Sequence, residues 1–288
     1  MSAPGQSGLG RGQSGLGRGQ SGPGRGQSGL GRGQSGLGRG QSGPGRGQSH
    51  PRPGPSGLAL GHPRVHLRVT DSTNTHARAL ALAGAPHGTL VTAREQTAGR
   101  GRGGRRWSAP PGSSVLMSLL LRSPPRLLPL IAAVAVCEVA GEQAQIKWPN
   151  DVVLAGPTGL AKLAGILVEG RPQQGWAVLG IGLNVAVRIE QLPVELRGRA
   201  ATLGRSAAEV DPPLAELLRA LTRWLERSEL ETLAAWRARD ALLGRAIAWG
   251  TDRGRAQGID GAGRLVVSLA DGGLLTLDAG EVHLLQVG

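Results

Sequence analysis

Residues 147–170 read KWPNDVVLAGPTGLAKLAGILVEG. Apolar runs at 151–154 and 163–169 flank the turn Gly156-Pro-Thr-Gly159, a pattern typical of two strands joined by a tight connection. Strand-like runs at 144–148 and 176–183 continue the pattern on both sides. The stretch therefore predicts neighbouring strands of one β-sheet, with polar residues placed between them.

The chain around this stretch alternates between strand and helix patterns. Asp71-Ser-Thr-Asn74 supplies side-chain oxygens that are expected to cap the first helix. The apolar spacing predicts further strands at 66–70, 88–94 and 114–122, and helices at 75–84, 126–142, 211–226 and 229–243. These elements favour an α+β fold in which a mixed β-sheet is packed with helices.

The last part of the chain has a different pattern of apolar residues. Short alternating runs separated by glycine occur at 246–249, 254–259, 265–269, 274–277 and 282–285. Five short strands in so little chain predict a small β-barrel. We therefore expect a tail at 1–60, a main domain at 61–243 and a barrel at 244–288.

The first 60 residues repeat the heptad Gly-Gln-Ser-Gly-Leu/Pro-Gly-Arg. Three of every seven residues are glycine, so this segment cannot bury enough apolar surface to offset its ordering entropy, and we expect a disordered tail. Its seven arginines, without any acidic residue, supply much of the formal net charge of +13. Such a tail could bind nucleic acid in a salt-dependent way, but it has no aromatic side chain for base stacking. A solvated leader is the simpler interpretation.

Cys137 is the single cysteine, which excludes an internal disulfide framework and favours a reducing, cytoplasmic location. Its place in an apolar helical pattern indicates packing rather than a catalytic thiol. The longest apolar run, 127–140, is too short to cross a bilayer, and no secretory signal is visible.

Lysine and asparagine are rare in this chain, although arginine is abundant. The chain contains two lysines and three asparagines beside 31 arginines, and all five stand in short motifs: Asn74, Lys147, Asn150, Lys162 and Asn184. A lysine is a compact point charge and an arginine a flat fork, so the two are not interchangeable in a tight pocket. Their placement therefore indicates a functional site.

The loop from Gln96 to Trp107 carries four arginines on a glycine-rich backbone. Cations and close backbone amides form a site for a polyanion such as a nucleoside triphosphate. A Gly-x-Gly-x-x-Gly match is also present, but the repeats of the tail match it too and no helix follows. An RGG-type RNA segment is a further alternative for such a loop, although not for one set between two strands.

Five motifs in register resemble the biotin protein ligase family, over roughly residues 64–288. They are Asp71-Ser-Thr-Asn74, Gln96-x-Ala-Gly-Arg-Gly-Arg102-x-Gly-Arg-x-Trp107, Lys147-Trp-Pro-Asn-Asp151, Lys162-Leu-Ala-Gly-Ile-Leu-x-Glu169 and Gly180-Ile-Gly-Leu-Asn184. The resemblance implies a class II synthetase-like catalytic domain, shared with lipoate ligases, followed by an SH3-like barrel. It also implies a monofunctional ligase, because the tail stands where some members carry a DNA-binding repressor domain.

By this resemblance, biotin is activated by ATP as biotinyl-5'-AMP and passed to a lysine of a biotin carboxyl carrier protein. ATP and biotin would be substrates and Mg2+ an activator, with no tightly bound cofactor. The implied catalytic residues are Lys162, Arg102, Asp151 and Lys147. The biotin site would comprise Ser72, Thr73, Asn74, Gln96, Arg100, Gly101, Arg102 and Lys162, and the ATP site Arg102, Arg105, Trp107, Lys147, Asn150 and Asn184.

Several roles and alternatives remain open at this point. Asp151 could hold Mg2+ indirectly, accept a proton from the incoming lysine amine, or orient Lys147. Asn184 could bind metal or triphosphate oxygens, or simply close a strand end. Trp148 and Ile166 are expected in the core. The rival functions are lipoate ligation and nucleic-acid binding through the tail. A carboxylase carrier is the expected partner, a membrane is not, and a homodimer stays open.

Overall fold

The computed structural model describes residues 60–278 and 280–285. Apart from its last residue, the expected tail at 1–60 lies outside these residues. None of the helices within the described ranges combines the length and apolar composition that a membrane span requires.

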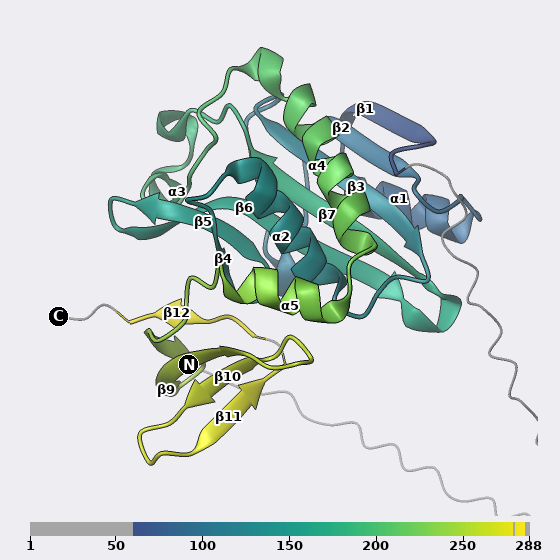
Figure 1. The fold of residues 1–288 in the computed structure, drawn as a ribbon. Coiled ribbons are helices and arrows are strands. Elements are labelled where there is room, and N and C mark those ends of the chain that lie inside the picture. The colour runs from purple at the N-terminus through teal and green to yellow at the C-terminus, as the bar shows by residue number, and fades with distance from the viewer. Residues whose placement is uncertain (1–59, 279, 286–288) are drawn as a thin grey trace, which may run out of the picture. The chain divides into compact units, whose positions relative to one another are not determined.

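A seven-stranded mixed sheet forms the centre of the main domain (Figure 1). Its strand order is β1-β2-β3-β7-β6-β5-β4, in which β1 and β2 are parallel and the other neighbours are antiparallel. The strands span Arg64–Thr70 (β1), Leu90–Gln96 (β2), Ser114–Arg122 (β3), Gln145–Lys147 (β4), Asp151–Gly156 (β5), Gly159–Arg171 (β6) and Trp176–Asn184 (β7). The turn expected at 156–159 joins β5 to β6.

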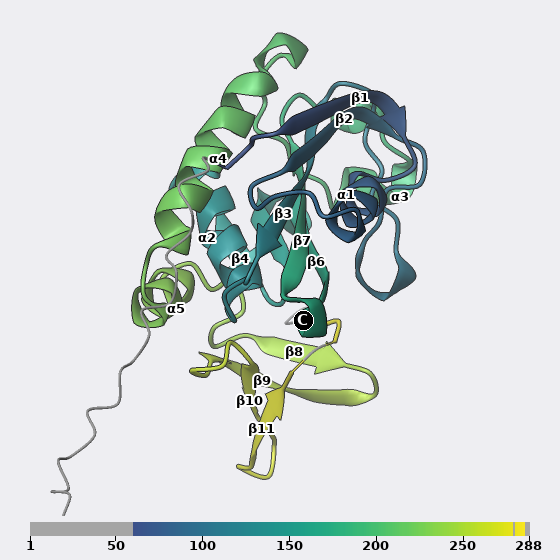
Figure 2. The ribbon, with the colours of Figure 1, turned by 90° about the vertical axis from the view of Figure 1, so that its right-hand side faces the viewer.

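Helices cover both faces of this sheet (Figure 2). Helix α1 (Thr73–Leu82) packs on one face through Ala77 and Ala81. Helices α2 (Leu128–Ala140), α4 (Asp211–Leu225) and α5 (Glu229–Arg237) pack on the other. A short helix, α3 (Val194–Arg197), lies in the connection between β7 and α4. Apolar side chains are therefore needed on both faces of the central strands, and β3 is buried from Ser114 to Leu121.

Two expected helix ends differ from the structure. The cap of α1 is Ser72, but its side chain makes no capping hydrogen bond, because the polar residues of this motif face a cavity instead. The helix expected to reach residue 243 ends at Arg237. Residues 239–241 form backbone hydrogen bonds with β4 instead. Ile146 donates its N–H to the Arg239 carbonyl, and its own carbonyl accepts the N–H of Ala241.

A second, antiparallel sheet follows α5. Its strands are β8 (Ala246–Trp249), β9 (Asp252–Ile259), β10 (Leu265–Ser268), β11 (Leu274–Leu277) and β12 (His283–Leu284), in the order β11-β10-β9-β8-β12. The five short strands expected from the sequence are thus confirmed. The indole N–H of Trp148 donates to the Gly263 carbonyl at 3.1 Å, which ties the motif after β4 to this sheet.

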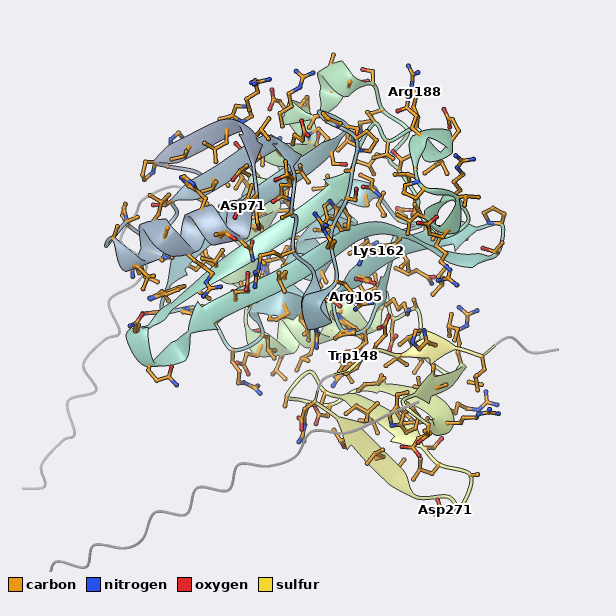
Figure 3. The ribbon with its side chains drawn as sticks, turned by 180° about the vertical axis from the view of Figure 1, so that it is seen from behind. Asp71, Arg105, Trp148, Lys162, Arg188 and Asp271 are labelled. Atoms are coloured by element: carbon orange, nitrogen blue, oxygen red, sulfur yellow. The ribbon has the colours of Figure 1, made fainter. Side chains whose placement is uncertain are left out.

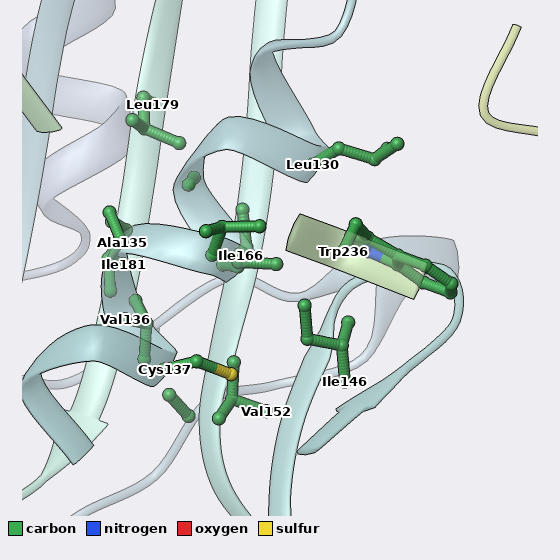
Figure 4. Close-up of a cluster of buried hydrophobic side chains, with 14 of the residues drawn as sticks. Leu130, Ala135, Val136, Cys137, Ile146, Val152, Ile166, Leu179, Ile181 and Trp236 are labelled. Carbon is green, nitrogen blue, oxygen red and sulfur yellow. The ribbon is translucent and has the colours of Figure 1, made fainter. Parts of the chain in front are cut away.

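The largest core lies between α2 and the central sheet (Figure 4). Cys137 is completely buried there, in the same cluster as Ile146, Val152 and Trp236. Burial raises the pKa of its thiol to about 12, because the thiolate would lose its hydration. The sequence-based expectation of a packing cysteine agrees with this environment.

Cys137 is therefore expected to resist thiol reagents in the folded protein. At pH 8 only about one thiol in ten thousand would be ionised with such a pKa, and the side chain is also shielded from the reagent. Labelling with a chromogenic disulfide should reach far less than one thiol per chain in native buffer and one per chain in guanidinium chloride. Rapid labelling of the native protein would contradict the described packing.

Candidate active site

A cavity opens on the α1 face of the central sheet. Figure 3 views the molecule from behind and labels Lys162 and Arg105, two of the residues at this cavity. Its lining comes from the start of α1, the end of β2, the glycine/arginine loop and the middle of β6 and β7. The lining residues are Ser72, Thr73, Asn74, Gln96, Arg100, Gly101, Arg102, Arg105, Arg106, Trp107, Met117, Asn150, Lys162, Gly165, Ile166, Leu167, Gly180, Ile181 and Gly182.

One wall of the cavity is a connected polar network. Gln96 Oε1 accepts hydrogen bonds from the Thr73 N–H at 2.7 Å and the Thr73 hydroxyl at 3.0 Å. The Ser118 hydroxyl lies 2.8 Å from Thr73 Oγ1 and 2.6 Å from Asn74 Oδ1. Asn74 Nδ2 then donates to Glu169 at 2.9 Å. Hydroxyls and carboxamides both donate and accept, so this wall suits a ligand with donors and acceptors on one ring.

Two glycines of β7 make room for the side chains that line the cavity. A methyl group on Gly180 would lie 2.8 Å from Asn74 Cγ, and one on Gly182 would lie 2.8 Å from Trp107 Cζ2. Both separations are too short for non-bonded carbon atoms. The glycines in Gly180-Ile-Gly-Leu-Asn184 are therefore required by close approach to Asn74 and Trp107.

The glycine/arginine loop folds back on itself across the cavity. Gly101 donates its N–H to the Arg105 carbonyl at 2.7 Å, and Trp107 donates to the Gly99 carbonyl at 2.9 Å. The reversal lies at Gly103 and Gly104, whose φ angles of 60° and 76° favour glycine. This geometry gathers the loop arginines beside the cavity.

Positive charge is concentrated around Lys162. Its ammonium lies 2.7 Å from Asp151 Oδ1 and 5.6 Å from the centre of the Trp107 ring. Burial lowers the pKa of Arg102, and the neighbouring Arg105 lowers it further. Burial also lowers the pKa of Lys147, although Asp151 opposes the shift. Charges held at a partly dehydrated site interact strongly with an anionic ligand.

Two acidic residues hold the loop through its arginines. Glu169 accepts from Arg100 at 2.9 Å and also lies 3.4 Å from Arg78. Burial alone would raise the pKa of Glu169, but hydrogen bonds from Asn74 and Arg100 lower it overall, so the group stays ionised. Arg105 forms an ion pair with Glu281, which precedes β12 in the second sheet. The two pairs connect the loop to both sheets.

The structure brings most of the expected site residues to one cavity. Lys147, Asp151 and Asn184 are the exceptions, since none of the three is among the lining residues. Asp151 nevertheless forms an ion pair with Lys162, which does line the cavity. Asp151 on β5 is also the register partner of Lys147 on β4. Trp148 is buried as expected, whereas Ile166 is buried and also lines the cavity.

The two asparagines expected at the nucleotide brace the backbone here. Asn150 lines the cavity, but its Nδ2 donates to the Ile166 carbonyl at 2.8 Å. Asn184 Nδ2 donates to the Ala201 carbonyl at 2.9 Å, and its Oδ1 accepts from Ser114 at 3.3 Å. Both amide atoms of Asn184 thus have partners within the fold, and its expected role toward metal or triphosphate oxygens stays a prediction.

Glu169, Ser118 and Glu281 were missed as site residues by sequence reasoning. Glu169 stands at the end of the Lys162 motif, and a lone acid among apolar residues was a signal for it. Ser118 and Glu281 gave no such signal, because each acts through residues distant in sequence. Within the described residues, no three His, Cys, Asp or Glu side chains cluster as a protein metal site requires.

Comparisons with known proteins agree with this site and fold. The profile of the Biotin/lipoate A/B protein ligase family matches residues 66–185, and that of the Biotin protein ligase C terminal domain matches residues 249–285. The second match identifies the five-stranded sheet with the SH3-like domain expected from the sequence.

Three relatives illustrate the similarity. The bifunctional ligase/repressor BirA of Bacillus subtilis is 41% identical over 162 residues, which are 52% of this chain and 49% of that protein. This chain thus matches about half the length of that relative. The biotin--[acetyl-CoA-carboxylase] ligase of Paracoccus denitrificans is 36% identical over 228 residues, covering 70% of this chain and 92% of that protein.

The third is the biotin protein ligase of Aquifex aeolicus, solved in complex with biotin and ATP. It superimposes with a TM-score of 0.65 at 27% identity, covering 78% of this chain and 99% of that one. Sequence similarity and fold agree over both sheets. The chain therefore belongs to the biotin protein ligase family.

Proposed function

We propose that this protein is an ATP-dependent ligase that activates biotin as biotinyl-5'-AMP and transfers it to a lysine of a biotin carboxyl carrier protein. The single observation that carries the proposal is the cavity in which Lys162 faces the polar wall beneath the arginine loop. The relatives named as biotin--[acetyl-CoA-carboxylase] ligases support a carrier from acetyl-CoA carboxylase or a related carboxylase.

The first step places negative charge where this site holds cations. A biotin carboxylate oxygen attacks the α-phosphorus of ATP, the bond to the β-phosphate bridging oxygen breaks, and pyrophosphate leaves. Lys162 and Arg102 both line the cavity; Lys162 would reach the carboxylate and the new acyl-phosphate oxygen, and Arg102 would hold the α-phosphate. Fixed cations at these positions stabilise the charge that develops in the transition state.

The remaining residues would bind and orient the substrates. Ser72, Thr73, Asn74 and Gln96 face the cavity as the wall suited to the ureido ring of biotin, and Arg100 and Gly101 would cover it from the loop. Arg105 and Trp107 would hold the nucleotide side. Asn150 would act there only by bracing the strand beside the site.

The second step consumes the adenylate. The carrier lysine amine attacks the acyl carbon, AMP leaves, and the amine loses a proton. Once a ligand draws Lys162 away, Lys147 would balance the charge of the Asp151 carboxylate, and that carboxylate would then accept the proton and become neutral. This assignment uses the 2.7 Å contact between Asp151 and Lys162.

The acidic groups beside the cavity do not form a ready site for Mg2+. Asp151 is paired with Lys162 and Glu169 with Arg100. Magnesium commonly binds substrate phosphates and retains several waters. We propose that it enters with the phosphates of ATP, and neither reaction step depends on a protein ligand for it. The reducing cytoplasm is the proposed location, because Cys137 is the one cysteine of the chain.

Carrier labelling tests the proposed activity. The purified protein with ATP, Mg2+, biotin and a carboxyl carrier domain should attach biotin to one carrier lysine, detectable as a mass increase of the carrier. Lipoate in place of biotin should give no such increase, which separates the two branches of the family profile. No labelling of a carrier that another biotin ligase does modify would contradict the proposal.

Biotin with ATP is expected to protect the loop from trypsin. Arg100, Arg105 and Arg106 are exposed, although Arg100 and Arg105 also form ion pairs, and bound ligand phosphates would reduce the access of trypsin to all three. Mapping of the cleavage products should show slower cutting at these three residues. Arg188 is an exposed arginine outside the cavity lining and serves as the internal control. Equal cleavage of the loop with and without biotin and ATP would contradict the expectation that the loop contacts these ligands.

A further inference from the structure

Glu169 continues a row of residues along one face of β6. Side chains two positions apart in a strand point to the same face, so Glu169 follows Gly165 and Leu167, both of which line the cavity. Glu169 is not itself among the lining residues, but its side chain is only 17% exposed and contacts two residues that are. The sequence thus places an acidic group beside the cavity, at the end of β6 that lies nearest to α1.

The two carboxylate oxygens of Glu169 hold different parts of the site. Oε2 accepts a hydrogen bond from Asn74 Nδ2 at 2.9 Å, and Oε1 accepts one from the Arg100 guanidinium, also at 2.9 Å. Arg78 on α1 approaches the same Oε1 at 3.4 Å. Asn74 belongs to the polar wall of the cavity and Arg100 to the glycine/arginine loop. One carboxylate therefore joins the wall to the loop.

Glu169 also determines which way the Asn74 carboxamide points. Asn74 is buried and lies against Gly180, where an added methyl group would collide with it. Its Oδ1 lies 2.6 Å from the Ser118 hydroxyl, and its Nδ2 faces Glu169. Reversal of the amide would set Oδ1 against the carboxylate, and two acceptors cannot share a hydrogen bond. The carboxylate thus holds this wall residue in one orientation.

We propose that Glu169 is a positioning residue for biotin binding, which fixes Asn74 in the cavity wall and holds the loop at the cavity through Arg100. The proposal rests on the proposed function, in which this wall and this loop bind biotin. Because the two donors approach different oxygens, the position requires a group with two acceptor oxygens, and its charge strengthens the bond to Arg100. Lys162 pairs with Asp151 instead, so the effect of Glu169 falls on binding rather than on the chemical step.

Glu169→Gln tests this role in biotin-dependent ATP–pyrophosphate exchange. Glutamine has nearly the same size but only one acceptor oxygen, so its amide nitrogen would face one of the two donors. We expect the KM for biotin to rise about tenfold, the order of effect of one lost charge-assisted hydrogen bond, with kcat within about threefold of wild type. An unchanged KM for biotin, or a loss confined to kcat, would overturn the proposal.

Glu138→Gln is the matched control. Glu138 on α2 also accepts from one neutral donor and one arginine, the Trp224 indole N–H at 2.8 Å and the Arg223 guanidinium. None of these three residues lines the cavity. We expect the KM for biotin to stay within about twofold of wild type, because exposed ion pairs contribute little. An equal rise in KM in Glu138→Gln and Glu169→Gln would overturn the specific role of Glu169. Thermal denaturation of both variants identifies any loss caused by unfolding.

Arg100→Gln removes the other member of the ion pair and keeps the test decisive even where Glu169→Gln does not fold. The Arg100 side chain is 48% exposed, so its substitution should leave the fold intact. We expect Arg100→Gln to raise the KM for biotin about tenfold, and the double variant to be worse than Arg100→Gln by about threefold or less. A wild-type KM in Arg100→Gln, or losses that multiply independently in the double variant, would contradict the coupling.

Trypsin cleavage provides a readout that needs neither biotin nor activity. In the protein without ligands, Glu169→Gln should free the Arg100 guanidinium and speed cutting after Arg100 by about threefold or more, because the loop then opens more easily. Cutting after Arg188, an exposed arginine outside the cavity lining, should stay at the wild-type rate. Equal cutting after Arg100 in Glu169→Gln and the wild type would overturn the proposal, whereas absence of exchange in the wild type would contradict only the proposed function.

Discussion

Lys162→Arg is expected to lower kcat for biotin-dependent pyrophosphate exchange by about 10²- to 10³-fold, the size of effect seen when one preorganised electrostatic group is lost. The positive charge is kept, so the loss must come from shape. Lys162 Nζ sits beside Asp151 and over Trp107, and a methyl group on Gly165 would already lie 3.1 Å from Lys162 Cε. A guanidinium fork is longer and wider than an ammonium and cannot occupy the same position.

Arg223→Lys provides the matched control for that experiment. Arg223 pairs with Glu138 between α4 and α2, neither residue is among the cavity-lining residues, and the Arg223 side chain is 54% exposed. We expect this exchange of one basic side chain for the other to leave kcat within about twofold of wild type, because exposed ion pairs contribute little. Normal activity in Lys162→Arg would show that the site needs only a charge, and would contradict the assigned role of Lys162.

Gly182→Ala is expected to lower kcat/KM for biotin activation by about 10²-fold through a shift of the indole ring. The added methyl would lie 2.8 Å from Trp107 Cζ2 and Nε1. Trp107 ends the arginine loop and its backbone N–H donates to the Gly99 carbonyl, so a displaced ring must either change its side-chain torsions or shift the loop. The strand itself accepts alanine, because the φ of Gly182 is not in the left-handed region.

The same substitution at Gly261 tests whether any added methyl has this effect. A methyl group on Gly261 would have no neighbouring atom within 4 Å, and the φ of this residue is not left-handed, so Gly261→Ala should behave as wild type. Steady-state kinetics and fluorescence of the tryptophans, measured on both variants, check the expected displacement. Full activity of Gly182→Ala would contradict the close packing of Trp107 against β7.

Regular elements with a clear apolar pattern could be predicted from the sequence. The strand at 114–122 and the turn at 156–159 occur as expected, since burial on both faces requires a continuous apolar run and the turn needs Gly and Pro. The end of α5 could not be predicted. Residues 238–243 continue a helical pattern, but pairing of 239–241 with β4 replaces the last turns, and a single sequence contains no signal for that contact.

The position of the site could be predicted from the sequence, but the contacts between its residues could not. The rarity of lysine and asparagine indicated the residues around the cavity, and the five motifs indicated their chemistry. The partner of Arg105 lies 176 residues away in the second sheet, so local pattern could not reveal Glu281. Rarity also assigned similar weight to all three asparagines, whereas the structure places Asn74 in the cavity wall and Asn184 in the backbone beside it.

Direct detection of the acyl-adenylate tests the central claim that Lys162 and the arginine loop join biotin to the α-phosphate of ATP. The wild-type protein, incubated with biotin, ATP and Mg2+ without any carrier, should yield biotinyl-5'-AMP by mass spectrometry, and Lys162→Arg should yield far less. Absence of biotinyl-5'-AMP with the folded wild-type protein, or its equal formation by Lys162→Arg, would contradict that claim.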